Sequence, residues 1–396
     1  MAAEVDGAKA AVRAEVDARA DALIAVSHSI HSHPEENFEE RHAHDLLCEV
    51  IEAEGLAVER GAFGLPTAFR AVAGTSGPTI AVLCEYDALP GLGHACGHNI
   101  IAAAGLGAGL AAAALADRVG GRVVLLGTPA EEGGGGKVFM IERGALDDVD
   151  AAMMIHPADV DLRWMTTIAY QRLIVEFVGE AAHAAAQPWN GRNALDAAVL
   201  GYMNVAALRQ HIRPDERVHG IFTDGGEKPN IVPAHASMDW YVRAADLERL
   251  AALKPRVLAA LQAGADAAGC ELEHRWVEPV YADLVRNVPL EDLYVANSEA
   301  LGRPVGAPGV DGEVIGSTDM GNVSHVVPAI HPMVAIAPAG VGIHTAPFAD
   351  HAASAPGDAG LLLAAKAMAM TVVDLWLRPE ALAACRDAFD RSRSAD

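Results

Sequence analysis

Apolar residues recur at three- and four-residue spacing through the first 55 residues, and this spacing predicts two helices. The first predicted helix covers residues 8–34, and the second covers residues 39–55 and ends at a glycine. Four β-rich runs follow. Between the second and the third of these runs, residues 100–116 are rich in Ala and Gly and predict a buried helix. The β-rich runs are TAFRAVAG, TIAVLCEY, RVVLLGT and AAMMIHP. Strands that alternate with helices predict an α/β sheet covered by helices on both faces.

The pattern changes near residue 165, where longer strands and two amphipathic helices take over. The predicted order is strand 166–179, helix 193–212, strand 218–223, strand 236–246, helix 246–269 and strand 271–279. This β-α-β-β-α-β order can bury its two helices on one face of a four-stranded sheet.

After about residue 282 the α/β texture resumes, with a predicted strand at 333–340 and a final helix near 360–377. A chain of 396 residues is too long for one small core. We therefore predict an α/β domain formed by residues 1–166 and 282–396, interrupted by an inserted α+β domain at residues 167–281.

The amino-acid composition indicates which kinds of molecule the protein is not expected to bind. The chain has 29 Lys and Arg against 53 Asp and Glu, and its formal charge of −24 repels nucleic acid and anionic membranes. The five cysteines are odd in number and widely spaced, and the first residues do not resemble a signal peptide. The longest apolar run, residues 100–116, consists mainly of Ala and Gly, which transfer weakly into lipid. We expect a cytoplasmic protein without disulfides, without nucleic-acid partners and without a membrane span.

Candidate chemistry begins in CEYDALPGLGHACGHN, residues 84–99, where His94, Cys96 and His98 lie within five residues. Imidazole and thiolate are good ligands for borderline-soft metal ions, and a Cys-x-His turn that enters a helix can direct both side chains at one ion. On this stretch alone, the same residues could also be ordinary core side chains.

A second cluster follows the RVVLLGT strand, where Glu131 and Glu132 precede four glycines. Adjacent side chains in an extended chain point in opposite directions, so one carboxylate can bind a metal while its neighbour acts as a base. A solvated acidic loop is the alternative. The GGGGK sequence does not fit a phosphate-binding loop, because Glu131 replaces the first glycine and Val138 replaces the Ser or Thr.

Three further histidines, His156, His183 and His344, lie at the ends of predicted elements. Each alone could be an ordinary surface histidine, but together they could complete a metal site. His325, His331 and the histidines of residues 28–44 have no comparable context.

Several segments together resemble the M20 metallopeptidase family, in the branch of β-alanyl-lysine-type dipeptidases, p-aminobenzoyl-glutamate hydrolases and N-acyl amino acid amidohydrolases. The similarity runs in order over residues 24–375, and GHACGHN with EYDALP upstream is its most specific part. The resemblance implies an α/β catalytic domain, with helices flanking a mixed sheet, and an inserted dimerisation domain. The segments are EYDALPGLGHACGHN, TPAEEGGGGK, HAAAQPWNGRNALDA, STDMGNVSHVVPAIHP and HTAPF.

By position, the resemblance implies a centre of two divalent metal ions, zinc or manganese, with Glu131 as the general base. Asp87 would orient a ligand from outside the metal shell. The implied metal ligands are Cys96, His98, Glu132, His156 and His344.

The resemblance also implies a homodimer, in which His183 reaches the partner's site and stabilises the oxyanion. Asn230 and Arg243 would hold the substrate near its free carboxylate, which a guanidinium can bind in bidentate fashion. Two positions depart from the pattern. Glu85-Tyr86-Asp87 replaces His-x-Asp, which leaves the role of Glu85 at the metal open, and HTAPF lacks the glutamate of HTPEF.

We therefore expect a metal-dependent hydrolase that cleaves the amide bond of an N-acyl amino acid or a small dipeptide. The alternatives are a p-aminobenzoyl-glutamate hydrolase and a non-catalytic ligand-binding protein that retains the fold. A zinc nucleoside deaminase is excluded because its P-C-x-x-C motif is missing. A cysteine hydrolase is disfavoured because Cys96 and His98, two residues apart on a turn, rarely face each other as nucleophile and base.

Overall fold

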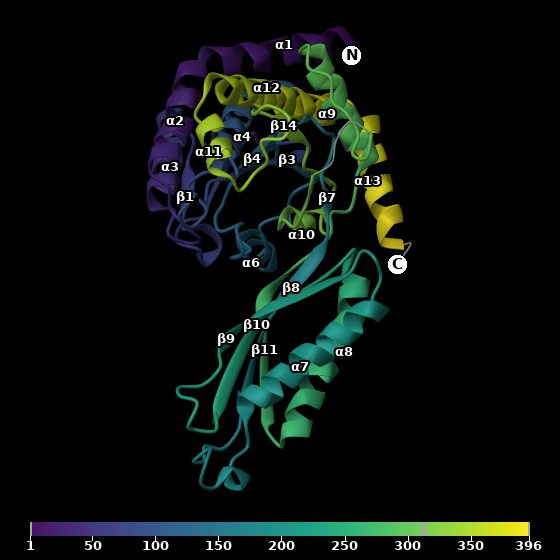
Figure 1. Ribbon diagram of the computed structural model, residues 1–396. Coiled ribbons are helices and arrows are strands. Elements are labelled where there is room, and N and C mark those ends of the chain that lie inside the picture. The colour runs from purple at the N-terminus through teal and green to yellow at the C-terminus, as the bar shows by residue number, and fades with distance from the viewer. Residues whose placement is uncertain (1, 311–313, 395–396) are drawn as a thin grey trace. The chain divides into compact units, whose positions relative to one another are not determined.

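The structure, a computed structural model, describes residues 2–310 and 314–394, and its chain forms two compact units (Figure 1). Unit 1 comprises Met1–Thr166 and Leu284–Asp396, and unit 2 comprises Thr167–Asp283. Each unit has a hydrophobic core of its own.

Unit 1 contains a six-stranded mixed sheet. The middle strands β4, β3 and β5 are parallel and β13 continues in the same direction, whereas β1 and β2 are antiparallel to their neighbours. Every residue of β3 is buried, as expected for a strand covered on both faces. The order across the sheet is β1 (Val58–Arg60), β2 (Phe69–Ala73), β4 (Arg122–Thr128), β3 (Thr79–Glu85), β5 (Ala151–Met153) and β13 (Ala329–Ile330).

Helices cover both faces of this sheet, which confirms the predicted fold class. On one face, α4 (His98–Ala113) packs so closely that Gly105 lies against Cys84. On the other face, α6 (Gly136–Glu142) and α10 (Met320–Ser324) cover Leu83 and Leu126. The remaining elements include α5 (Ala116–Val119), α9 (Val288–Ala300), α11 (Ala346–His351), α13 (Pro379–Ser394) and the short strands β6 (His156–Ala158), β7 (Thr166–Thr167), β12 (Ile315–Gly316) and β14 (Met333–Ala335).

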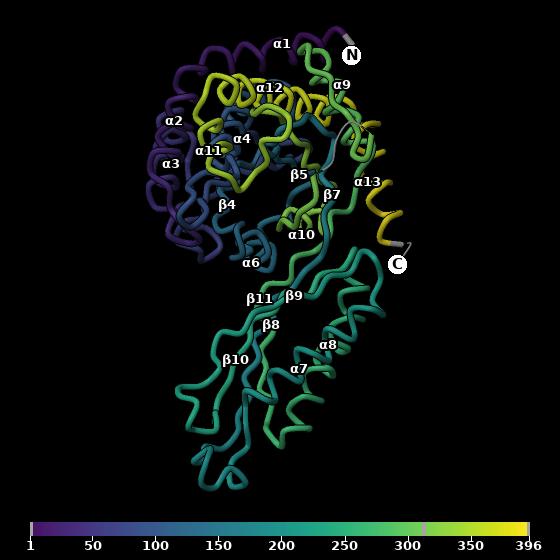
Figure 2. Tube along the Cα trace, in the orientation of Figure 1, coloured from purple at the N-terminus to yellow at the C-terminus, as the bar shows by residue number. Residues whose placement is uncertain are grey.

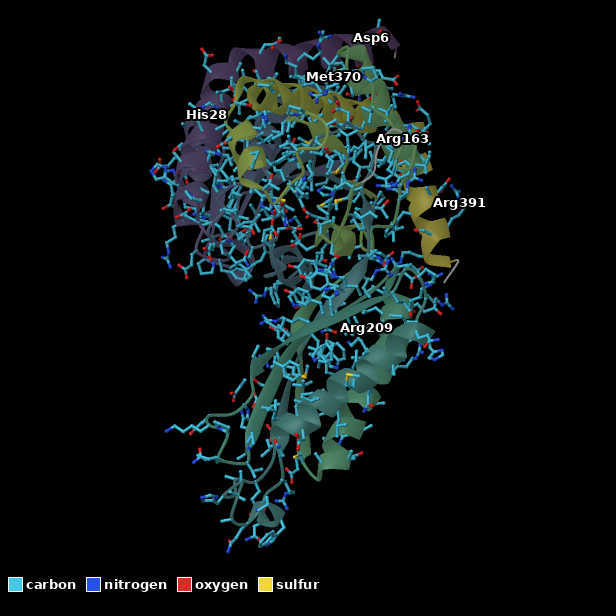
Figure 3. The ribbon with its side chains drawn as sticks, viewed as in Figure 1. Asp6, His28, Arg163, Arg209, Met370 and Arg391 are labelled. Carbon is cyan, nitrogen blue, oxygen red and sulfur yellow. The ribbon has the colours of Figure 1, made fainter. Side chains whose placement is uncertain are left out.

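The helix α12 (Ala355–Leu377) is long and apolar enough to cross a membrane by length and composition, but 78% of its apolar window is buried inside unit 1. It packs against α4 and α1, and Met370, labelled in Figure 3, belongs to its buried residues. Its surroundings are those of a core helix. The predicted buried helix at 100–116 is confirmed as α4, which is buried from its first residue to Ala112.

The N-terminal prediction of two helices is wrong, because the first predicted helix is two separate helices. They are α1 (Ala2–Ala18) and α2 (Ala20–Ser32), followed by α3 (Arg41–Ala53). The break lies at Arg19, whose guanidinium binds Glu15 on α1 and Glu54 beyond α3. Neither Gly nor Pro marks this break, so the local sequence carries no stop signal. The break allows α1 to pack on α12 and α2 to pack on α4.

Unit 2 has the predicted β-α-β-β-α-β order, and its strands form one antiparallel sheet in the order β11-β8-β10-β9. The two helices pack together on one face of the sheet, as the trace in Figure 2 shows. Trp240 is the largest fully buried side chain of this core. The elements are β8 (Ala169–Val178), α7 (Ala194–Leu208), β9 (Arg217–Asp224), β10 (His235–Ala244), α8 (Leu247–Ala268) and β11 (Glu271–Tyr281).

Candidate metal centre

The candidate site of unit 1 lies where parallel strands end. Glu85 is the last residue of β3 and pairs with Thr128, the last residue of β4. Glu131 and Glu132 follow β4, so they lie close to the end of β3. Loops at the carboxyl ends of parallel strands are the usual location of ligand sites in α/β folds.

A glycine shapes the turn that carries the first two predicted ligands. Gly97 precedes α4 with φ of 77°, in the left-handed region that favours glycine. A Cβ at this position would lie 2.8 Å from the side chain of Pro157. Because glycine allows this close approach, Cys96 Sγ lies 3.4 Å from His156 Nε2.

All five predicted metal ligands meet in one cluster. His344 Nε2 lies 3.5 Å from Cys96 Sγ and 3.4 Å from Glu132 Oε1, and Glu132 Oε1 lies 3.9 Å from His98 Nε2. Donor atoms in each of two groups lie within 4.8 Å of one another, which is close enough to share an ion. The groups are Cys96, His98 and His156, and Cys96, Glu132 and His344.

The cluster is closed on most sides and open at one ligand. The side chain of His344 is 50% exposed, whereas that of Glu132 is 13% exposed and that of His98 is fully buried. His344 therefore lies on the side from which solvent and substrate can enter.

Two non-glycine residues at the site have left-handed backbones, with φ of 60° at Ala130 and 63° at His344. Such conformations are uncommon outside glycine and cost about 1 kcal/mol or more. Ala130 turns the chain directly before Glu131, and the His344 backbone is held by a 2.8 Å hydrogen bond to the Ala95 carbonyl. Both turns direct a functional side chain into the cluster.

Asp87 lies where the sequence predicts a residue that orients a ligand. Its Oδ1 is 3.1 Å from His98 Nδ1, and its Oδ2 accepts a 2.9 Å hydrogen bond from the Glu132 backbone. A proton on Nδ1 that is donated to Asp87 leaves the lone pair of Nε2 facing the cluster. Asp87 thus positions two of the predicted ligands.

The polar atoms of the cluster fit a bound cation. Three buried atoms, His98 Nε2, Glu132 Oε1 and Glu85 Oε1, have no hydrogen-bond partner among the residues that the structure describes. Buried polar atoms are normally satisfied, and a group of acceptors that face one another is satisfied by a positive ion. The mixture of thiolate, imidazole and carboxylate suits zinc or manganese.

The buried surroundings also shift the pKa values of the site. Burial raises the pKa of Glu131 well above its ordinary value, and the charges of Glu85 and Glu132 raise it further. Burial, with the nearby His98, lowers the pKa of His156 to about 3, so this imidazole is neutral and able to bind a metal.

Sequence reasoning missed three buried residues beside the cluster. Lys137 forms ion pairs with Glu85 and Asp319, and the ring of His331 lies edge-on to that of His156 at 5.4 Å between centroids. Both ring nitrogens of His331 lack hydrogen-bond partners in the described part of the chain. These contacts join segments far apart in sequence, so no local spacing could reveal them.

The other three predicted site residues belong to unit 2. His183 and Asn230 are neighbours, because residues 183 and 231 form a β-bridge and the Asn230 carbonyl accepts a bond from the Ala184 backbone. Arg243 lies at the other end of the sheet, where its guanidinium carbon is 4.9 Å from the ring centroid of Tyr170.

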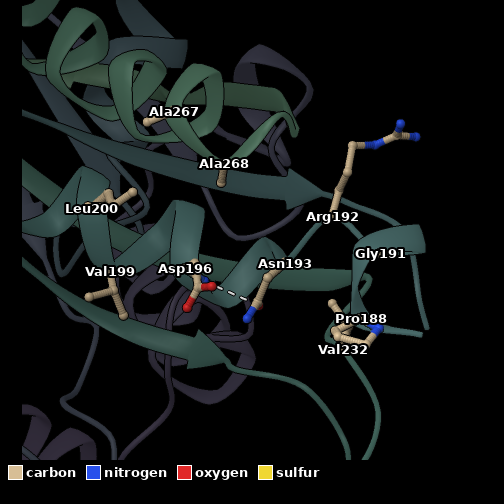
Figure 4. A pocket seen from close by; sticks show the side chains of 10 residues that line it. All are labelled: Pro188, Gly191, Arg192, Asn193, Asp196, Val199, Leu200, Val232, Ala267 and Ala268. Carbon is tan, nitrogen blue, oxygen red and sulfur yellow. Dashed lines mark hydrogen bonds between the residues drawn. The ribbon is translucent and has the colours of Figure 1, made fainter. Parts of the chain in front are cut away.

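Unit 2 also contains a hollow of about 560 Å³ near the start of α7 (Figure 4). Asn193 in its wall caps α7 by accepting bonds from the backbones of Leu195 and Asp196, and Arg192 extends away from the hollow. None of the predicted metal ligands lines this hollow.

The fold and the cluster define a metallopeptidase-type hydrolase, and comparison with known proteins gives its family. The sequence profile of peptidase family M20/M25/M40 matches residues 81–369, so the chain belongs to this family and is a hydrolase. The family resemblance of the motifs is therefore confirmed.

Individual relatives span nearly the whole chain. Xaa-Arg dipeptidase of Mus musculus is 40% identical over 98% of this chain and 93% of its own length. One of the p-aminobenzoyl-glutamate hydrolase subunits of Escherichia coli K12 is 31% identical over 91% of this chain and 90% of its own length. A solved dinuclear metal-binding M20 peptidase from Bacillus subtilis shares the fold, with a TM-score of 0.69 at 19% identity, over 91% of this chain and 99% of that one.

Proposed function

We propose that the protein is a two-metal dipeptidase that cleaves dipeptides with a basic carboxyl-terminal residue. The observation that carries this proposal is the buried cluster in which three acceptor atoms face one another without partners in the described residues, next to Glu131. Membership of the family supports hydrolysis, and the relative with 40% identity supports the dipeptide substrate.

The five predicted ligands would hold two divalent ions, zinc or manganese. Such ions supply Lewis acidity both for the scissile carbonyl and for an attacking water. The chain contributes the remaining chemistry. Cys96 belongs to both groups of potential ligands, and Asp87 fixes the ring of His98 and the backbone of Glu132.

Glu131 is the residue that would move the proton. It belongs to a group with Glu85 and His98 whose atoms lie within 4.8 Å of one another, so its carboxylate borders the cluster. Burial raises its pKa, and a carboxylate with a raised pKa is a better base at neutral pH. Glu131 would accept a proton from the attacking water and return it to the leaving amine.

Substrate choice rests on charge. The chain carries a formal charge of −24, which favours the approach of a cationic dipeptide over an anionic one. The second candidate is hydrolysis of p-aminobenzoyl-glutamate, supported by the Escherichia coli relative with 31% identity. Arg243 could bind the carboxylate of either substrate.

Amine release from a panel of amides tests the proposed function. We expect Ala-Arg to be cleaved with a kcat/KM at least about tenfold above that of Ala-citrulline, its neutral isostere. The panel also includes N-acetylalanine and p-aminobenzoyl-glutamate, with chelator-treated protein as the blank. Preferential cleavage of p-aminobenzoyl-glutamate would support the second candidate function. If the metal-loaded protein cleaves none of the amides, the result would support a non-catalytic binding protein.

We also propose a homodimer in which His183 serves the partner's site. Nδ1 of His183 accepts bonds of 3.2 Å from the backbones of Ala185 and Ala186, so its proton lies on Nε2. The exposed Nε2–H is a donor suited to an oxyanion. Arg243 pairs with Tyr170 at the start of β8, whereas His183 lies beyond its end, roughly 26 Å away at about 3.3 Å per residue. One small substrate cannot contact both residues within one chain.

The surface of unit 2 offers an interface for this dimer. The strand β9 lies at an edge of the sheet, and edge strands readily pair with another chain. Exposed apolar side chains on β9 and α7 lie together, because the Phe222 and Tyr202 rings stack at 5.8 Å. The exposed residues on the helix side are Val199, Leu200, Met203 and Phe222, and the exposed Ile221 lies on the opposite face of β9.

Mixing two inactive variants tests the shared site. When His183→Ala and Glu131→Gln proteins are mixed and allowed to exchange protomers, we expect about a quarter of wild-type activity, because half of the dimers are mixed and each has one intact site. Each variant alone is the control. Mixed dimers without activity would show that His183 does not act across the interface.

A further inference from the structure

Lys137 is a buried lysine that no step of the proposed reaction uses. It lies in the first turn of α6, and its side chain is 1% exposed. Its ammonium donates to Glu85 Oε2 and, at 2.7 Å, to Asp319 Oδ1. Its backbone N–H donates to the other oxygen of Asp319 at 2.9 Å. Lys137 is thus fixed at both its backbone and its side chain, and it fixes one oxygen of Glu85.

The other oxygen of Glu85 faces His98. Glu85 Oε1 lies 3.1 Å from His98 Nε2, but neither atom makes a hydrogen bond to any residue that the structure describes. In the form of His98 that can bind a metal, the ring is neutral and its proton lies on Nδ1, next to Asp87, so both facing atoms present lone pairs. Two buried lone pairs at this distance repel each other unless a cation lies beside them.

The charges around this pair lead to the same conclusion. Five buried or nearly buried carboxylates surround the cluster, and the Lys137 ammonium pairs with two of them, Glu85 and Asp319. Burial of so many anions needs further positive charge. The carboxylates are those of Glu85, Asp87, Glu131, Glu132 and Asp319.

We propose that Glu85 is a sixth protein ligand of the metal centre, on the side of His98, and that Lys137 is the positioning residue that presents its Oε1. This inference rests on the proposed metal centre and deepens it. The donor atoms of Glu85, His98 and Glu131 lie within 4.8 Å of one another, as required of groups around one ion. The ion on this side would also lie beside the general base.

Metal titration of the chelator-treated, full-length protein tests the proposal without any measurement of activity. Calorimetry with Zn²⁺ and with Mn²⁺ should show two sites in the wild type. In Glu85→Gln, which removes the charge, and in Glu85→Asp, which keeps the charge but shortens the side chain, one site should be weakened at least about tenfold. If Glu85→Gln does not fold, Glu85→Asp decides by the same criterion.

Glu40 offers a matched control, because it is also a fully buried carboxylate. Its oxygens are already used, since they accept bonds from the backbones of Phe38 and Ala130 and from the Thr67 hydroxyl. Glu40→Gln should therefore keep both sites at wild-type affinity.

A second readout examines the ligands themselves. The visible spectrum of Co²⁺-loaded protein depends on the number and type of ligands, so it should change in Glu85→Gln and remain unchanged in Glu40→Gln. Lys137→Gln should weaken the same site as Glu85→Gln, because the free oxygen of Glu85 is no longer held in place.

The proposal would be overturned if the Glu85→Gln variant binds two metal ions with wild-type affinity and has an unchanged Co²⁺ spectrum. A wild-type protein that binds no divalent ion would overturn it together with the metal centre. If the wild-type protein binds two ions but cleaves no amide, only the proposed function is overturned. The metal affinities of the Glu85 variants would still test whether Glu85 is a ligand.

Discussion

Replacement of Glu131 by glutamine is expected to lower kcat by about 10³-fold, in the range that general bases contribute. Glutamine has the size of glutamate but cannot accept the proton of the attacking water. The five predicted ligands remain in place, so metal content and thermal stability should stay close to wild type. Steady-state kinetics and metal analysis of the same preparation provide the measurement.

The adjacent residue is the control for this variant. Glu132 lies 3.4 Å from His344 and within 4 Å of His98, so Glu132→Gln should lose metal as well as activity. Wild-type turnover in Glu131→Gln, or loss of its metal, would contradict the division of roles between the two acids.

Replacement of Lys137 by methionine is expected to lower the free energy of unfolding by about 3–5 kcal/mol, as when one partner of a buried ion pair is removed. Methionine fills most of the space but leaves Glu85 and Asp319, both fully buried, without their ammonium. Urea unfolding of chelator-treated protein measures this change.

Lys366→Met is the matched control, since Lys366 pairs with Asp17, whose side chain is 61% exposed. Removal of such a surface pair should change the free energy of unfolding by about 0–1 kcal/mol. If the two substitutions lower the free energy of unfolding equally, the buried ion pairs of Lys137 stabilise the fold no more than a surface pair does.

The predictable part of the site consists of residues that are neighbours in sequence. Cys96 and His98 flank one glycine, and Glu131 and Glu132 are adjacent, so their chemistry can be read from short motifs. The roles of His156, His183 and His344 came from the order of motifs over the whole chain, because each histidine alone has an ordinary context.

Contacts between distant segments could not be predicted. Lys137 and Asp319 are 182 residues apart, and each motif alone gave no reason to pair them. His331 has no motif of its own, and only the fold brings it against His156. Likewise, no motif alone reveals that Arg243 and Asn230 lie at opposite ends of the unit 2 sheet.

The helices and strands were predictable where the hydrophobic periodicity was strong and one face of the element was buried. The strands that form the centre of the sheet in unit 1 and the six elements of unit 2 follow the hydrophobic pattern closely. The break at Arg19 was missed because it depends on tertiary contacts, and α9 was missed because it lacks a strong apolar stripe. By contrast, α13 was missed although its buried residues Leu382, Cys385 and Phe389 recur at helical spacing.

The central claim, a two-metal amide hydrolase, is tested most directly by returning metal to chelator-treated protein. Amine release from Ala-Arg should be absent before Zn²⁺ or Mn²⁺ is added and should rise until about two ions are bound per chain. Full activity of protein that is shown to contain no metal would contradict the account.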